Sequence, residues 1–125
     1  HNVAIIVRVP FEEGLLTGGL APGYEFETGD WRAGWLTPER LQEAARRVEA
    51  LRGFLTPDRP TLARLALKFI LSHPAVSTVI PGMRRMAHVL ENTAASDGIL
   101  LSAADLEALR AHAFIHGWKY PWAQE

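Results

Sequence analysis

The chain has 125 residues, 48% hydrophobic and 22% charged, with a formal net charge of −1 at pH 7, which is the ordinary balance of one globular domain. This balance excludes a basic nucleic-acid footprint and a polybasic membrane patch, and no apolar run approaches the roughly 18 residues of a membrane span. Cysteine is absent, which excludes disulfides and thiolate metal sites, and we expect a cytoplasmic protein without nucleic-acid or membrane partners.

The first residues predict a short buried strand. The run Val3–Val9 is rich in β-branched side chains, is apolar on both faces as in a parallel strand, and is closed by Pro10. The sequence lacks an initiator Met and opens almost directly on this strand, so we expect a fragment or a processed chain. Residues 14–30 are rich in glycine and predict a loop with no regular element beyond a turn.

Two helices are predicted next. Residues 37–39 read Thr-Pro-Glu, which places a capping side chain, a proline and an acid at a helix start, and Gly53 is expected to cap the helix end. A second helix begins near Thr61, carries a wide apolar stripe that predicts burial, and ends at His73 because the residue before proline avoids helical geometry.

A second strand and two more helices complete the pattern. Ser77–Ile80 predicts a short strand, and a helix from Met86 to Ala95 is expected to direct Val89 and Leu90 inward. The last helix starts at residues 102–105, a capping box with Asp in place of the usual Glu or Gln. Two apolar strands joined through helices predict a parallel α/β unit, and its unpaired strand edges offer a surface for self-association.

Two segments resemble the aldo-keto reductase family. Residues 8–18, RVPFEEGLLTG, resemble the seventh barrel strand and its following loop, and residues 66–85, ALKFILSHPAVSTVIPGMRR, resemble the last α/β unit closely in residues and spacing. The resemblance implies an α/β fold, the C-terminal portion of a (β/α)8 TIM barrel with its last two strands and their helices, incomplete as a barrel. It divides the chain into the strand and cofactor loop 1–20, an insertion and helix 21–60, the last α/β unit and terminal helix 61–116, and the tail 117–125.

The segment after the second strand predicts a phosphate site. A strand end, a glycine-containing loop and a helix start bring free backbone N–H groups together, and Arg84 adds a guanidinium that can grip a phosphate with two hydrogen bonds. The alternative is that Arg84 and Arg85 are a solvated surface pair. The resemblance implies that the adenosine end and 2′-phosphate of NADPH are held by Gly82, Met83, Arg84, His88, Glu91 and Asn92.

Three of these positions have other interpretations. His88 departs from the Gln, Lys or Arg that is more usual in the family and would add charge only at lower pH. Glu91 can also be interpreted as a surface acid of the helix. Asn92 can be interpreted as a residue that caps a helix or forms a local hydrogen bond.

The first strand end carries the rest of the expected cofactor site. Arg8 stands where many family members place an aromatic ring against the nicotinamide, and the alternative is a strand-end arginine paired with a carboxylate. Glu12 and Glu13 are expected to be loop acids that point away from the pyrophosphate. The resemblance implies that the nicotinamide and pyrophosphate are contacted by Arg8, Val9, Pro10, Phe11, Gly14 and Leu15.

No catalytic or metal-binding residue is expected in this chain. The family's catalytic Asp, Tyr, Lys and His come from earlier strands, and His112 and His116 have metal-ligand spacing but no third ligand. The resemblance therefore implies part of an NADPH-dependent enzyme that reduces aldehydes or ketones, inactive on its own. The alternative is a non-catalytic, truncated or regulatory protein of the same family that binds the cofactor or serves in interactions. The tail aromatics are expected either to line a substrate mouth or to pack: Trp118, Tyr120 and Trp122.

Overall fold

The computed structural model describes residues 3–123, which contain one two-stranded parallel sheet. Strand β1 (Ile5–Arg8) pairs with β2 (Val76–Ile80), so the predicted parallel pair is confirmed. The register places Arg8 opposite Ile80 and is irregular between Ile5 and Ile6, where the amide of Ile5 donates to Ser77 Oγ at 3.1 Å. The two strands therefore end side by side at the same edge.

The expectation that the first strand is buried is wrong for the described part of the chain, and the second strand is largely exposed as well. Ile6 and Ile80 are 61% and 59% exposed, while Val7 and Val79, which pair with each other, are half-buried. The helix α3 (Leu62–Leu71) packs against β2, but no third strand among residues 3–123 flanks the pair. The apolar composition of the strands is thus not matched by burial in these residues.

The two central helices begin where their capping residues predict. Helix α2 (Pro38–Ala50) starts after Thr37, whose hydroxyl accepts from the amide of Arg40, and α3 (Leu62–Leu71) starts after Thr61, which accepts from the amide of Arg64. The prediction that Gly53 caps α2 is wrong. The chain continues from α2 into a 3-10 turn, Leu51–Phe54, and Gly53 lacks the positive φ of a left-handed cap.

The later helices match the prediction except that one side chain expected to point inward is exposed. Helix α4 (Met86–Thr93) passes into a 3-10 turn, Ala94–Ser96, and α5 (Ala103–Arg110) is capped by Ser102. Leu90, expected to point inward, is 65% exposed. Asn92 is the buried residue of α4, because the side of the helix next to α3 carries Asn92 and Glu91 rather than Leu90.

The insertion contains a short helix where a loop was expected. Helix α1 (Arg32–Trp35) follows Trp31, and a 3-10 turn, Leu15–Thr17, precedes it in the cofactor loop region. Trp35 is 1% exposed and lies in a core cluster with Leu15 and Leu36. A four-residue helix has no repeating apolar period, so its sequence resembles that of a loop.

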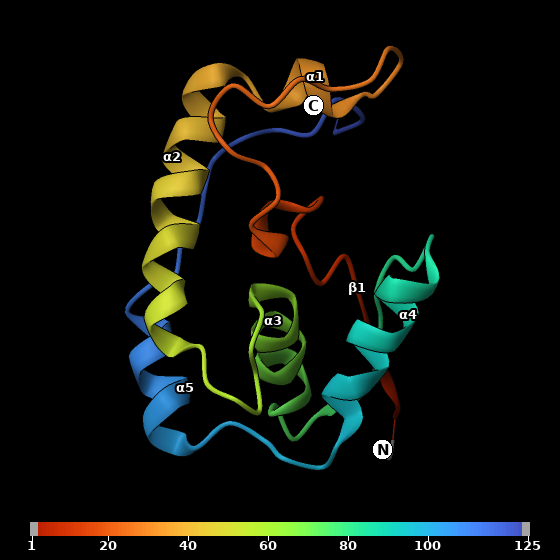
Figure 1. The fold of residues 1–125 in the computed structure, drawn as a ribbon, viewed down its shortest axis with the longest axis vertical. Helices are drawn as coiled ribbons and strands as arrows, with labels where there is room; N and C mark the ends of the chain where they lie inside the picture. Colours follow the sequence, from red (N-terminus) through yellow and green to blue (C-terminus); the bar gives the residue numbers. More distant parts are fainter. Residues whose placement is uncertain (1–2, 124–125) are drawn as a thin grey trace.

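The C-terminal segment returns along α2 to the insertion. Figure 1 shows the blue chain after α5 running past the length of α2 and ending beside α1. On this path Phe114 lies under the guanidinium of Arg47, at 3.9 Å, and Trp118 and Tyr120 pack on the core cluster around Trp35. A second cluster joins α3 to α5 through Leu65, Leu101 and Leu109. No helix among residues 3–123 is both long and apolar enough to cross a membrane.

Candidate functional site

Two loops leave the sheet at the same edge. The parallel register places Arg8 and Ile80 side by side, so residues 9–14 and residues 81–85 both begin at the carboxyl ends of their strands. In open and closed parallel α/β folds, ligands bind at this edge because the loops that follow the strands converge there. The register therefore brings together the two groups of residues that the sequence predicts for the cofactor.

The loop of residues 9–14 has a strained backbone. Val9, Glu12 and Glu13 have φ angles of 52°, 46° and 54°, in the left-handed region that side chains with a Cβ rarely adopt. The loop is folded on itself, since the amides of Gly14 and Leu15 donate to the carbonyls of Phe11 and Glu12, each at 3.0 Å. Such strain costs about 1–3 kcal/mol per residue, and it clusters at ligand sites.

The insertion fastens one side of this loop. Arg32 donates from Nη1 to the carbonyl of Glu13 at 3.0 Å, and its other nitrogens contact both oxygens of Asp30. Gly14 leaves room for this arginine, because a Cβ at Gly14 would lie 3.3 Å from Arg32 Nη1. The hydrogen bonds from Arg32 lower the pKa of Asp30, and those to Asp30 raise the pKa of Arg32. Both groups therefore stay charged over the neutral range.

The tail fastens the other side of the loop through Glu12. Tyr120 donates its hydroxyl to Glu12 Oε1 at 2.6 Å, and His116 Nε2 lies 3.0 Å from the same oxygen. Burial, and then the hydrogen bond to Glu12, raise the pKa of Tyr120. A phenol whose proton is held more tightly than usual is poorly suited to act as a general acid. No local sequence pattern predicts this contact, because its partners lie more than 100 residues apart.

The loop after β2 presents arginine and free amides. Gly82, Met83 and Arg84 are exposed, and Arg85 occupies the N-cap position of α4 without a side-chain hydrogen bond to the helix. By contrast, helices α2, α3 and α5 each begin with a hydroxyl that accepts such a bond. Neither Arg84 nor Arg85 forms an ion pair within residues 3–123. The first turn of α4 thus offers N–H donors and positive charge to solvent.

Asn92 braces this loop from inside the helix. It is 8% exposed, and its Nδ2 donates to the carbonyl of Gly82 at 3.3 Å. Arg84 in turn lies close enough to Asp30 to lower the pKa of that carboxyl group, after the larger effects of Arg32 and of burial. The insertion therefore faces the loop after β2 across the edge of the sheet.

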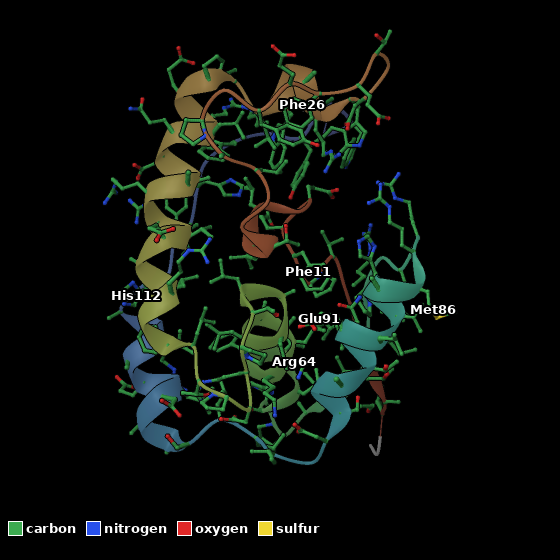
Figure 2. The ribbon with its side chains drawn as sticks, viewed as in Figure 1. Phe11, Phe26, Arg64, Met86, Glu91 and His112 are labelled. Atoms are coloured by element: carbon green, nitrogen blue, oxygen red, sulfur yellow. The ribbon has the colours of Figure 1, made fainter. Side chains whose placement is uncertain are left out.

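The remaining predicted residues lie in different surroundings. His88 is exposed on α4, whereas Glu91 accepts from Thr61 Oγ1 at 2.5 Å and from Arg64 Nη2 at 2.9 Å. Figure 2 shows Arg64 and Glu91 directed toward one another between α3 and α4, while Met86 points away from the molecule. Glu91 thus joins two helices in this structure, and a contact with adenine would have to leave these bonds in place.

Arg8 remains available for a ligand. Its side chain is exposed and has no ion pair within residues 3–123, so the interpretation of a strand-end arginine paired with a carboxylate is not what the structure shows. It is near enough to Tyr120 to lower the pKa of that phenol slightly against the larger opposing effects. Pro10 and Leu15 are buried beneath the loop, and Phe11 is half-buried.

The histidines and the tail aromatics have structural partners. His112 packs edge-on against Phe54, His116 contacts Glu12, and no three metal-ligating side chains gather within residues 3–123. Tyr120 stacks on Trp35 at 4.7 Å between ring centres, and Trp122 contacts Trp31 at 4.6 Å. In the structure these tail rings pack against the insertion.

An apolar cavity of about 480 Å³ lies under the loop, between α2, α3 and the segment after α5. Pro10 and Glu12 form part of its wall, while leucine and other apolar side chains form most of the rest. Two arginines also line it, but Arg47 is paired with Glu43 and Arg110 with Glu107, so the exposed edge beside Arg84 is the better place for an anion.

Comparison with known proteins gives consistent matches. The profile of the Aldo/keto reductase family matches residues 1–113. The chain is 27% identical over 114 residues to an uncharacterized oxidoreductase, YqkF, of Bacillus subtilis (strain 168), covering 90% of this chain and 35% of that protein. It is 28% identical over 117 residues to the L-glyceraldehyde 3-phosphate reductases of Escherichia coli O157:H7 and K12, covering 90% of this chain and 34% of each. The chain therefore spans about a third of the length of these relatives.

Proposed function

Because this chain belongs to the aldo/keto reductase family, we propose that it forms the adenosine and pyrophosphate side of an NADPH site in an enzyme that reduces aldehydes or ketones. The 2′-phosphate lies at the start of α4, against Gly82, Met83 and Arg84, with His88, Glu91 and Asn92 further along the helix. The pyrophosphate and nicotinamide lie along the first loop, which is formed by Arg8, Val9, Pro10, Phe11, Gly14 and Leu15.

The observation that carries this proposal is the unpaired Arg84 beside the uncapped start of α4. A helix start without a side-chain cap leaves backbone N–H groups unsatisfied, and the helix dipole makes that end positive. Arg84 lies two residues before the first helical residue and has no ion pair within residues 3–123 to compete with a ligand. Donors and fixed charge of this kind fit a phosphate monoester, which is the group that distinguishes NADPH from NADH.

The proposed roles of this chain are binding and orientation. NADPH supplies the hydride when it is bound, and the loops at the carboxyl ends of β1 and β2 fix the position of its two ends. No residue of the chain is assigned a catalytic role. Tyr120 donates a hydrogen bond to Glu12 and has a raised pKa, which is opposite to the lowered pKa of an activated phenol. The reaction and its carbonyl substrate therefore belong to the proposal for the whole enzyme.

Substitution of Arg84 tests the proposal directly. In the full-length protein, Arg84→Ala is expected to raise the Kd for NADPH by roughly 10- to 100-fold, which corresponds to losing a hydrogen bond to a charged group. The Kd for NADH should not change, because NADH lacks the 2′-phosphate. Titration of the nicotinamide fluorescence measures both constants.

Arg46→Ala is the matched control, since Arg46 is an exposed arginine of α2 that bonds only to Glu43. This variant should bind both cofactors as the wild type does. Equal affinities of the wild type for NADPH and NADH would contradict a 2′-phosphate site at Arg84. Binding of NADPH without turnover of any aldehyde or ketone would favour the alternative, a non-catalytic cofactor-binding protein of the family.

A further inference from the structure

Glu12 receives two hydrogen-bonding groups from the far end of the sequence. Tyr120 and His116 lie 108 and 104 residues after it, and both contact Glu12 Oε1, at 2.6 and 3.0 Å. An ionised carboxylate only accepts, so His116 Nε2 carries the proton of that bond. His116 is 14% exposed in its side chain and Glu12 is 34% exposed, so these bonds form in a partly desolvated place where they are stronger than in water.

The groups that hold Glu12 are themselves fixed. The ring of Tyr120 stacks on Trp35 with an interplanar angle of 18°, and Trp35 is 1% exposed. The ring of His116 stacks on Trp118 at 4.5 Å, and Trp118 lies under the guanidinium of Arg40 on α2. The two donors therefore pack against other aromatic rings. These ring contacts hold the donors in place if the loop with Glu12 moves.

The loop needs such support. Val9, Glu12 and Glu13 all have positive φ, and a strained backbone of this kind persists only where the surroundings impose it. Arg32 holds the backbone at Glu13, and the tail holds the side chain of Glu12. Without the second support the loop would relax toward ordinary backbone geometry, and its carboxylate would be free to approach a bound pyrophosphate.

We propose that Tyr120 and His116 are positioning residues, which hold the loop of residues 9–14 in its strained form and thereby slow the release of the nicotinamide cofactor. The inference rests on the proposed function, because it takes this loop as the wall of the pyrophosphate site. The two residues act through Glu12 and do not touch the cofactor. A protein whose binding-competent form is only partly populated binds more weakly in proportion to that population, so loosening the loop lowers affinity without removing any cofactor contact.

Tyr120→Phe is the decisive variant, because it keeps the ring that stacks on Trp35 and removes only the hydroxyl that Glu12 accepts. In the full-length protein we expect NADPH to dissociate about tenfold faster in stopped-flow fluorescence, with a similar rise in Kd; a tenfold change equals about 1.4 kcal/mol. The KM for the carbonyl substrate should be unchanged. Glu12→Gln, which keeps an oxygen that can accept from Tyr120, should lie close to the wild type, whereas Glu12→Ala should resemble Tyr120→Phe.

Tyr24→Phe is the matched control, since Tyr24 is an exposed tyrosine of the insertion that packs edge-on against Phe26. It should release NADPH at the wild-type rate. Amide hydrogen exchange at Leu15 and Leu16, whose N–H groups bond within the loop, gives a readout that needs no cofactor. Exchange there should be faster in Tyr120→Phe.

The two proposals fail in different ways. A wild-type protein that binds NADPH, together with a Tyr120→Phe variant of equal release rate and equal amide exchange, would overturn the inference and leave the proposed function standing. A wild-type protein that binds no NADPH would overturn the proposed function. Faster exchange at Leu15 and Leu16 in the variant would then still support the fastening of the loop by Tyr120.

Discussion

Lys68 places its ammonium group in the interior, at 0% exposure, on the side of α3 that faces the end of α4. Its Nζ donates to both oxygens of Asp97, at 2.7 and 2.9 Å, and to the carbonyl of Ile99 at 2.7 Å. All three donor positions of the ammonium are therefore used. The hydrogen bond from Lys68 is the main cause that lowers the pKa of Asp97, so this carboxyl group remains ionised at neutral pH.

Replacing this lysine should destabilise the fold. Lys68→Met keeps most of the side-chain volume but leaves the carbonyl of Ile99 without its donor, and we expect the free energy of unfolding to fall by about 2 kcal/mol. Urea unfolding followed by circular dichroism measures the change. Arg46→Met, on the exposed face of α2, should leave the unfolding midpoint where it is. An unchanged midpoint for Lys68→Met would show that the buried bonds contribute nothing net.

The roles of single residues differ in how far they can be predicted from the sequence. Arg84 can be proposed from the sequence because a strand, a turn and a helix start surround it within a few positions. Lys68 and Glu12 cannot, because the partners that define them lie 29 and more than 100 residues away in the sequence. Leu90 is a further case, since the sequence does not tell which side of a short amphipathic helix meets α3.

At the scale of elements, helix starts are predicted well because their signals are local. Thr37, Thr61 and Ser102 each cap the helix that follows, as their spacing to the next apolar run indicates. Helix ends and short elements are harder to predict from the sequence. Helix α2 ends by tightening into a 3-10 turn rather than at Gly53, and α1 is too short to show a period.

Thr61 caps α3 and also bonds to α4, so the two threonine caps of α2 and α3 are expected to differ in their contribution to stability. The hydroxyl of Thr61 accepts from the amide of Arg64 at 3.1 Å and donates to Glu91 on α4 at 2.5 Å, whereas that of Thr37 caps α2 and otherwise bonds only to Glu39 of the same helix within residues 3–123. We expect Thr37→Ala to cost about 1 kcal/mol and Thr61→Ala about 2 kcal/mol in the free energy of unfolding. Thermal unfolding of the two variants tests this order, and equal losses would mean that the bond to Glu91 adds no stability.

At the scale of the whole molecule, the two-stranded sheet is exposed where its composition predicts burial. The sequence predicts the parallel pairing correctly, because two β-branched runs joined through helices favour it. It also predicts the edge at which the expected cofactor residues meet. It does not predict the return of the tail along α2, since residues 112–122 have no apolar period and their position depends on contacts with the insertion.

The exposed sheet should make the 125-residue chain associate with itself when it is produced alone. Ile5, Ile6 and Ile80 are exposed apolar side chains on strands whose outer edges are unpaired within residues 3–123, which is a common route to association. Sedimentation velocity should show an average mass that rises with concentration, and Ile6→Thr should weaken this rise. Ile115→Thr is the control, because Ile115 is 97% exposed in the tail. A compact monomer at every concentration would count against this expectation.

The contact between Glu12 and Tyr120 also fixes an order of events during synthesis. A ribosome that adds about 5–20 residues per second needs roughly 5–20 seconds to make the 108 residues between them. During that interval the ribosome makes both strands, α3 and α4, including Arg84. The first loop still lacks the contacts of Glu12 with Tyr120 and His116. A nascent chain that stops before His116 would therefore contain Arg84 and an unfastened loop, so residues 116–120 decide whether residues 9–14 reach their final shape.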